Sequence, residues 1–168
     1  DTFTNIIRSV EERIGRKVPE DCPARSQAKL LAALERELTP VAGVKSAIEA
    51  LLGAGATLAV GSQGSHHTLQ LTLGVTGLLP FFQGRIFSAS QVTQPKPAPD
   101  LFLLAANTLG FAPSQCVVVE DSTRGVKAAL AAGMRILGYT ASVGREAIVA
   151  AGAEPVDDLA QVPKLLGL

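Results

Sequence analysis

Three charged residues occupy positions where an open α/β sheet places chemistry. Lys96 is in the segment PKPAPD (residues 95–100), and Glu120 with Asp121 follows the apolar run VVV (117–119). Such strands and loops end at the carboxyl edge of a parallel sheet, where ligands bind. A lysine supplies a point charge for phosphate, and carboxylate oxygens suit a hard cation such as Mg²⁺. The pattern predicts a site for phosphate and a divalent metal.

A second candidate feature is the polar turn GSQGS (61–65) after the apolar segment 57–60. A strand end that leads into a helix presents backbone N–H groups and a hydroxyl to an anion. A simpler interpretation stays open, in which Ser65 is only a helix N-cap and Ser62 a solvated turn residue.

Each of these charged residues also has an interpretation in which it takes no part in chemistry. Lys96 can be a surface lysine in a loop stiffened by Pro97 and Pro99, because exposed lysines are common. Asp121 or Ser122 can cap the next helix, which would not prevent the other from binding metal. Since adjacent strand residues face opposite ways, Glu120 and Asp121 reach one ion only if the chain turns at Asp121.

The elements that must position these residues alternate between helix and strand. The patterns predict strands near 56–61, 85–88, 116–120, 135–139 and 154–157. Helices are expected near 43–54, 65–78, 98–110, 122–132, 144–151 and 159–167. This rhythm predicts a Rossmann-like α/β fold, with a mostly parallel sheet covered by helices on both faces.

The first part of the chain has a different pattern. Two apolar stripes at helical spacing predict amphipathic helices before residue 39: Phe3, Ile6, Ile7, Val10 and Ile14, then Leu30, Leu31, Leu34 and Leu38. Gly15 ends the first stripe, and the segment TPVAG (39–43) is typical of a linker. We therefore expect two units, 1–38 and 39–168.

Composition excludes several classes of protein. Fifteen basic and fifteen acidic residues balance without a basic stripe, which argues against nucleic-acid binding. The long uncharged stretch 51–84 is broken by polar residues before it could span a bilayer, so no membrane association is expected. Cys22 and Cys116 stand in unrelated contexts and are expected to be reduced. With no secretory signal visible, we expect a cytoplasmic protein.

The order of these motifs resembles one known family. Gly61-Ser62 after an apolar strand, then KPAPD (96–100), then VVVEDS (117–122) and AAGM (131–134) is similar to the haloacid dehalogenase-like (HAD) hydrolase superfamily. Its β-phosphoglucomutase and phosphoglycolate phosphatase branch is the most similar. The resemblance covers about 43–168, and more loosely the segment before it.

The resemblance implies roles for particular residues. Ser62 and the Gln63 backbone N–H would bind the transferring phosphoryl group, and Lys96 would neutralise its charge and that of the attacking carboxylate. Glu120 and Asp121 would anchor Mg²⁺. Residues 1–38 would form part of a helical cap that closes over a small phosphorylated metabolite.

The covalent part of that chemistry has no counterpart here. The family opens with a strand that ends in Asp-x-Asp, of which the first aspartate attacks phosphorus and the second is general acid and base. No Asp-x-Asp occurs in the 168 residues. The missing strand would lie between the strands assigned to 56–61 and 116–120, so we expect the chain to be a fragment that lacks it.

The resulting expectation is a Mg²⁺-dependent hydrolase of small phosphate monoesters, which works through an aspartyl-phosphate on an upstream aspartate. One alternative is a phosphosugar mutase of the same family. The other is a non-enzymatic binding module that has lost its nucleophile. The complete protein is expected to be a monomer.

Overall fold

The computed structural model describes residues 2–168, and the surroundings of side chains from residue 7 onward. Asp1, and the side chains of Phe3 and Ile6 from the predicted stripe, lie outside that description. The chain divides into two compact units, one up to Leu38 and one from Thr39 to Leu168. Each unit is described by itself.

The first unit consists of helices α1 (Thr2–Ile14) and α2 (Cys22–Glu37). Both lie where the apolar stripes predict them. Gly15, with φ +68°, ends α1 in the left-handed conformation that glycine adopts without strain. Glu11 fixes the turn that follows, because its carboxylate accepts hydrogen bonds from Lys17 Nζ and Val18 N, each at 3.1 Å.

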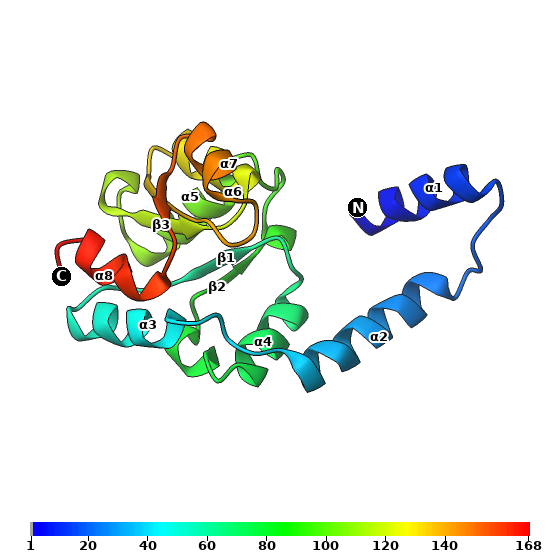
Figure 1. Ribbon diagram of the computed structural model, residues 1–168, viewed down its shortest axis with the longest axis horizontal. Coiled ribbons are helices and arrows are strands. Elements are labelled where there is room, and N and C mark those ends of the chain that lie inside the picture. Colours follow the sequence, from blue (N-terminus) through cyan, green and yellow to red (C-terminus); the bar gives the residue numbers. More distant parts are fainter. Residues whose placement is uncertain (1) are drawn as a thin grey trace. The chain divides into compact units, whose positions relative to one another are not determined.

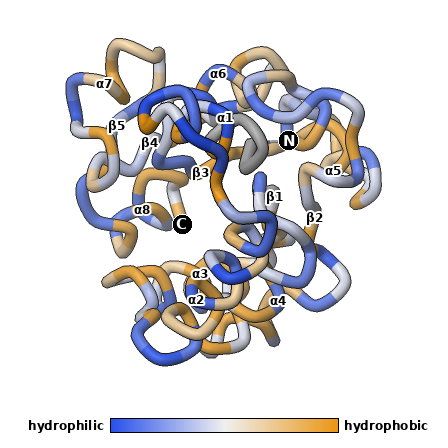
Figure 2. The backbone as a smooth tube through the Cα atoms, turned by 90° about the vertical axis from the view of Figure 1, so that its right-hand side faces the viewer, coloured by the Kyte–Doolittle hydropathy of each residue, from blue (hydrophilic) through white to orange (hydrophobic). Residues whose placement is uncertain are grey.

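The second unit alternates strands and helices in the predicted order (Figure 1). Its strands are β1 (Val60–Ser62), β2 (Ile86–Ser88), β3 (Val117–Glu120), β4 (Arg135–Tyr139) and β5 (Glu154–Val156). Its helices are α3 (Val44–Gly53), α4 (His66–Val75), α5 (Asp100–Leu109), α6 (Thr123–Ala131), α7 (Arg145–Ala150) and α8 (Val162–Leu165). Figure 2 shows the accompanying alternation of hydrophobic and hydrophilic segments along the chain.

All strand pairs are parallel, which confirms the predicted fold class. The strands form two ladders, β1–β2 and β3–β4–β5. Ser62 pairs with Ser88 in the first ladder, and Glu120 pairs with Gly138 in the second. Within residues 2–168, no ladder joins β1 to β3. The carboxyl ends of β1 and β3 carry the predicted site residues.

Several element boundaries differ from the prediction by a few residues, most clearly at β1 and at the last helix. Strand β1 begins at Val60 rather than near 56, because the Arg85 guanidinium takes the Leu58 carbonyl as its hydrogen-bond acceptor, at 2.9 Å. The last predicted helix is divided into a 3₁₀ turn, Leu159–Gln161, and the short helix α8. Asp158 starts the turn by accepting a hydrogen bond from Ala160 N at 2.9 Å.

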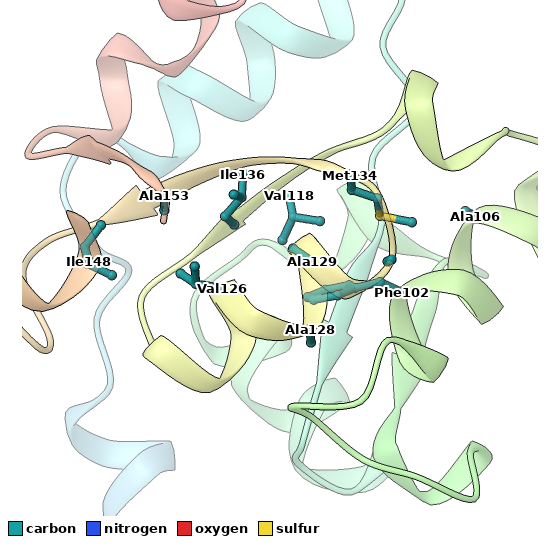
Figure 3. Close-up of a cluster of buried hydrophobic side chains, with 11 residues drawn as sticks. Phe102, Ala106, Val118, Val126, Ala128, Ala129, Met134, Ile136, Ile148 and Ala153 are labelled. Atoms are coloured by element: carbon teal, nitrogen blue, oxygen red, sulfur yellow. The ribbon is translucent and has the colours of Figure 1, made fainter. Parts of the chain in front are cut away.

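The core nearest the site packs α6 against β3 and β4. Figure 3 shows Val118 and Ile136 from these strands beside Val126 and Ala129 of α6, with Phe102 of α5 at the same cluster. Val126 and Ala129 are fully buried, since small side chains let the helix approach the sheet closely. This packing fixes the position of the β3–α6 turn, residues 120–122, which holds the predicted acidic pair.

Among residues 2–168, the structure has no helix of the length and hydrophobicity that a bilayer span requires. Cys22 and Cys116 are both free thiols in the structure.

Candidate active site

Lys96 joins the ends of β1 and β3. Its ammonium group donates a hydrogen bond to the Gly61 carbonyl at 3.0 Å and forms an ion pair with Glu120. The two side chains are only 5% and 10% exposed. The alternative interpretation of Lys96 as a surface lysine is therefore wrong. Lysine has three N–H donors. Two serve these partners, and the third lies outside both interactions.

The backbone of Lys96 is held as firmly as its side chain. Its carbonyl accepts hydrogen bonds from Gln63 Nε2 at 3.2 Å and from Arg124 Nη2 at 2.6 Å. The ammonium nitrogen also lies 4.5 Å from the centre of the Phe102 ring, a favourable cation–π distance. The turn after β1 and the first turn of α6 thus both contact the backbone of one lysine.

The turn after β1 is held by hydrogen bonds of three serine side chains. Ser62 Oγ accepts a hydrogen bond from Gly64 N at 3.2 Å, and its own O–H can still be donated to a ligand. Ser65 caps α4 by accepting from Thr68 N at 3.2 Å, so the capping interpretation of Ser65 is confirmed. Ser88 in β2 is fully buried and also holds this turn, because its Oγ donates a hydrogen bond to the Gly64 carbonyl at 2.7 Å.

The acidic pair at the end of β3 is divided between two environments. The Glu120 carboxylate points to Lys96 and also accepts hydrogen bonds from Ser122 Oγ at 2.9 Å and from the backbone N–H groups of Asp121 and Ser122, each at 3.2 Å. Ser122 caps α6 by accepting from Gly125 N at 3.0 Å, as one of the alternatives predicted.

Asp121 is exposed, and one of its carboxylate oxygens accepts a hydrogen bond from Ser142 Oγ at 2.6 Å. Within residues 2–168, no three acidic, histidine or cysteine side chains gather as a metal-binding group. Mg²⁺ is commonly held by one or two carboxylates, with water and substrate phosphate completing its shell. Asp121 fits such a site as one carboxylate ligand.

Sequence reasoning missed three residues that shape this site: Arg124, Ser88 and Ser142. Ser142 follows β4, the neighbour of β3, so the rule that the carboxyl ends of parallel strands meet could have indicated it. Arg124 and Ser88 contact the site through backbone carbonyls, for which the sequence holds no signal.

The fold is thus a parallel α/β sheet with a buried lysine and an exposed aspartate at its carboxyl edge, the edge at which open α/β sheets bind ligands. The family model of the haloacid dehalogenase-like hydrolases matches residues 5–133. The chain belongs to this family.

Two curated relatives from Escherichia coli (strain K12) are phosphatases. The chain is 30% identical over 127 residues to 6-phosphogluconate phosphatase, a match that covers 71% of the chain and 58% of the relative. It is 43% identical over 77 residues to fructose-1-phosphate phosphatase YqaB, covering 46% of the chain and 40% of the relative. The chain thus spans about half the length of these relatives.

Solved structures have the same fold. A haloacid dehalogenase-like protein of unknown function from Agrobacterium tumefaciens is 32% identical, with a TM-score of 0.81 over 98% of this chain and 76% of that one. A putative β-phosphoglucomutase from Thermotoga maritima is 26% identical, with a TM-score of 0.83 over 96% of this chain and 76% of that one.

Proposed function

We propose that this chain supplies the phosphate-binding and metal-anchoring half of a phosphatase that acts on small phosphate monoesters, such as sugar phosphates. The observation that carries the proposal is the buried Lys96, whose ammonium group lies between the ends of β1 and β3 with one N–H donor left for an anion. The names of the phosphatase relatives support the substrate class.

We propose that the nucleophile is an aspartate on a strand that lies between β1 and β3 and precedes α1 in the natural polypeptide. In support, each of these strands is paired on one edge only within residues 2–168. Unpaired backbone groups at such edges favour a further strand. Lys96 contacts the ends of both flanking strands, so it would lie beside a carboxylate presented there.

The proposed reaction has two steps. The aspartate attacks phosphorus, the ester P–O bond breaks and the alcohol leaves, with a proton from the general acid. Water then cleaves the aspartyl-phosphate and releases inorganic phosphate. Through both steps the Lys96 ammonium stabilises negative charge, while the Ser62 hydroxyl and the Gln63 N–H orient the phosphoryl oxygens. Mg²⁺, anchored by Asp121, would supply further charge neutralisation.

Residues 1–38 are proposed to belong to a cap over this site. Their division from the second unit at Leu38 supports a separate role. A closing cap would exclude water until substrate is bound.

The test is release of inorganic phosphate by the natural polypeptide that contains this chain. p-Nitrophenyl phosphate, fructose 1-phosphate and 6-phosphogluconate are the substrates, each with Mg²⁺ or with EDTA. We expect turnover with Mg²⁺ only, and its loss in Lys96→Ala. Isomerisation of a sugar phosphate without phosphate release would favour the mutase instead. Absence of turnover in a folded protein that carries Asp-x-Asp would overturn the proposal.

A further inference from the structure

The Glu120 carboxylate binds donors of the protein itself, three of them through Oε2 and Lys96 through Oε1. Four donors reach its two oxygens: Lys96 Nζ, Ser122 Oγ and the backbone N–H groups of Asp121 and Ser122. Its side chain is 10% exposed, whereas the next residue, Asp121, is exposed to solvent. A carboxylate satisfied in this way serves to hold its partners in place.

The space that this carboxylate occupies exists because residue 125 is glycine. A Cβ at Gly125 would lie 2.0 Å from Glu120 Cδ and 2.2 and 2.3 Å from its two oxygens. The three nearest atoms all belong to Glu120. Gly125 has no positive φ, so its backbone would accept any residue. Alanine is the better helix former, and the glycine is therefore explained by the carboxylate beside it.

The ion pair also determines where the Lys96 charge lies. The Lys96 carbonyl is fixed by Gln63 and Arg124, and its ammonium group by Gly61 and Glu120. Of these partners, only Glu120 carries negative charge. Without it, a buried ammonium would lose its compensating charge and turn toward water.

We propose that Glu120 is a positioning residue that fixes the Lys96 ammonium, and that Gly125 is required because it leaves room for the Glu120 carboxylate. The assignment rests on the proposed function for the task of Lys96, but the contacts that carry it are independent of turnover.

The experiment measures acylation of each lysine at one pH by mass spectrometry, with the exposed Lys45 and Lys127 as internal references. In the unmodified protein, Lys96 should react at least about tenfold more slowly than Lys127, because it is buried and paired. Glu120→Gln and Gly125→Ala should each raise the Lys96 rate about tenfold and leave the reference rates unchanged. Asp121→Asn is the matched control, and should not change it.

A double-mutant cycle separates this role from helix propensity. Gly125→Ala should lower Tm by about 5 °C in the presence of Glu120, and should leave it unchanged or raise it in the Glu120→Ala background. If Gly125→Ala alone does not fold but the Gly125→Ala/Glu120→Ala double variant does, this result supports the proposal equally.

Three results would overturn the proposal. One is a Lys96 in the unmodified protein that reacts as fast as Lys127, a measurement that needs no variant. The second is a Tm loss from Gly125→Ala that is the same with and without Glu120. The third is a Lys96 rate that Glu120→Gln leaves unchanged. Absence of phosphatase activity in every assay would contradict the proposed function only. The acylation rates and Tm values would still decide whether Glu120 positions Lys96.

Discussion

Ser142 Oγ donates a 2.6 Å hydrogen bond to Asp121 Oδ2, across 21 residues of sequence. Ser142 follows β4 and Asp121 follows β3, and these strands are neighbours in a parallel ladder. The bond orients the carboxylate that we propose as a metal anchor, as partners of metal ligands commonly do.

Ser142→Ala should therefore weaken Mg²⁺ binding without abolishing Mg²⁺-dependent turnover. We expect the Mg²⁺ concentration for half-maximal activity to rise about tenfold, because Asp121 remains but is no longer oriented. Asp121→Asn should remove the activity at every Mg²⁺ concentration. Ser142→Thr keeps the hydroxyl and is the matched control. An Asp121→Asn protein with unchanged Mg²⁺ dependence would show that Asp121 is not the anchor.

Lys96→Ala should lower kcat about 10³-fold, because the charge that stabilises the transferring phosphoryl group is lost. Lys127→Ala removes a lysine from the exposed side of α6 and serves as the control. Circular dichroism of both variants shows whether the fold survives. Equal activity of the two variants would remove Lys96 from the site.

Ser65→Ala should lower the free energy of unfolding by about 1 kcal/mol, because α4 loses the acceptor for Thr68 N. The measurement is urea unfolding at neutral pH. Ser65→Thr keeps a capping hydroxyl and should lose far less. An equal loss in the threonine variant would mean that the cap is not the cause.

The environment of the Asp157 carboxylate should make the stability of the protein depend on pH. Its pKa is lowered from the ordinary value of 3.8, first by the hydrogen bond from Thr140 Oγ1 at 2.6 Å and also by the positive charge of Arg145. A carboxyl group with a lowered pKa in the folded protein stabilises it above pH 3.8, and this contribution disappears as the pH falls through the folded-state pKa.

Thr140→Val should consequently lower stability at about pH 6 more than at about pH 2. Free energies of unfolding across this range measure the difference, and NMR titration of Asp157 should show its pKa rise in the variant. Thr140→Ser keeps the donor and should follow the unmodified protein. A Thr140→Val deficit that is constant with pH would place the effect in packing, not in the ionised carboxylate.

Much of the fold follows from the sequence because the hydrophobic periodicity and the positions of glycine and proline indicate the same helices and strands. The run VVV (117–119) and the small residues of α6 predict a strand and a closely packed helix, and both are present. The start of β1 was predicted too early, since nothing in the sequence shows that the Arg85 guanidinium takes the Leu58 carbonyl.

The sequence predicts where the site residues lie in the fold, but not which of their side chains contact one another. The sequence places Lys96 and Glu120 at the same edge of the sheet, but strand alternation does not tell which of two adjacent carboxylates meets the lysine. That choice depends on the space above Gly125 and on the turn at Asp121, both of which arise from packing of α6. The burial of Lys96 likewise follows from tertiary contacts, because lysines in loops are mostly exposed.

The most direct test of the proposed phosphatase is the intact mass of the natural polypeptide, measured after acid quenching during turnover of a phosphate monoester. We predict a protein heavier than 17.4 kDa, with a fraction that carries one extra phosphoryl group on an aspartate upstream of Thr2. Asp121→Asn should lack that fraction. A folded protein that contains Asp-x-Asp and never becomes phosphorylated would contradict the proposal and favour a binding module.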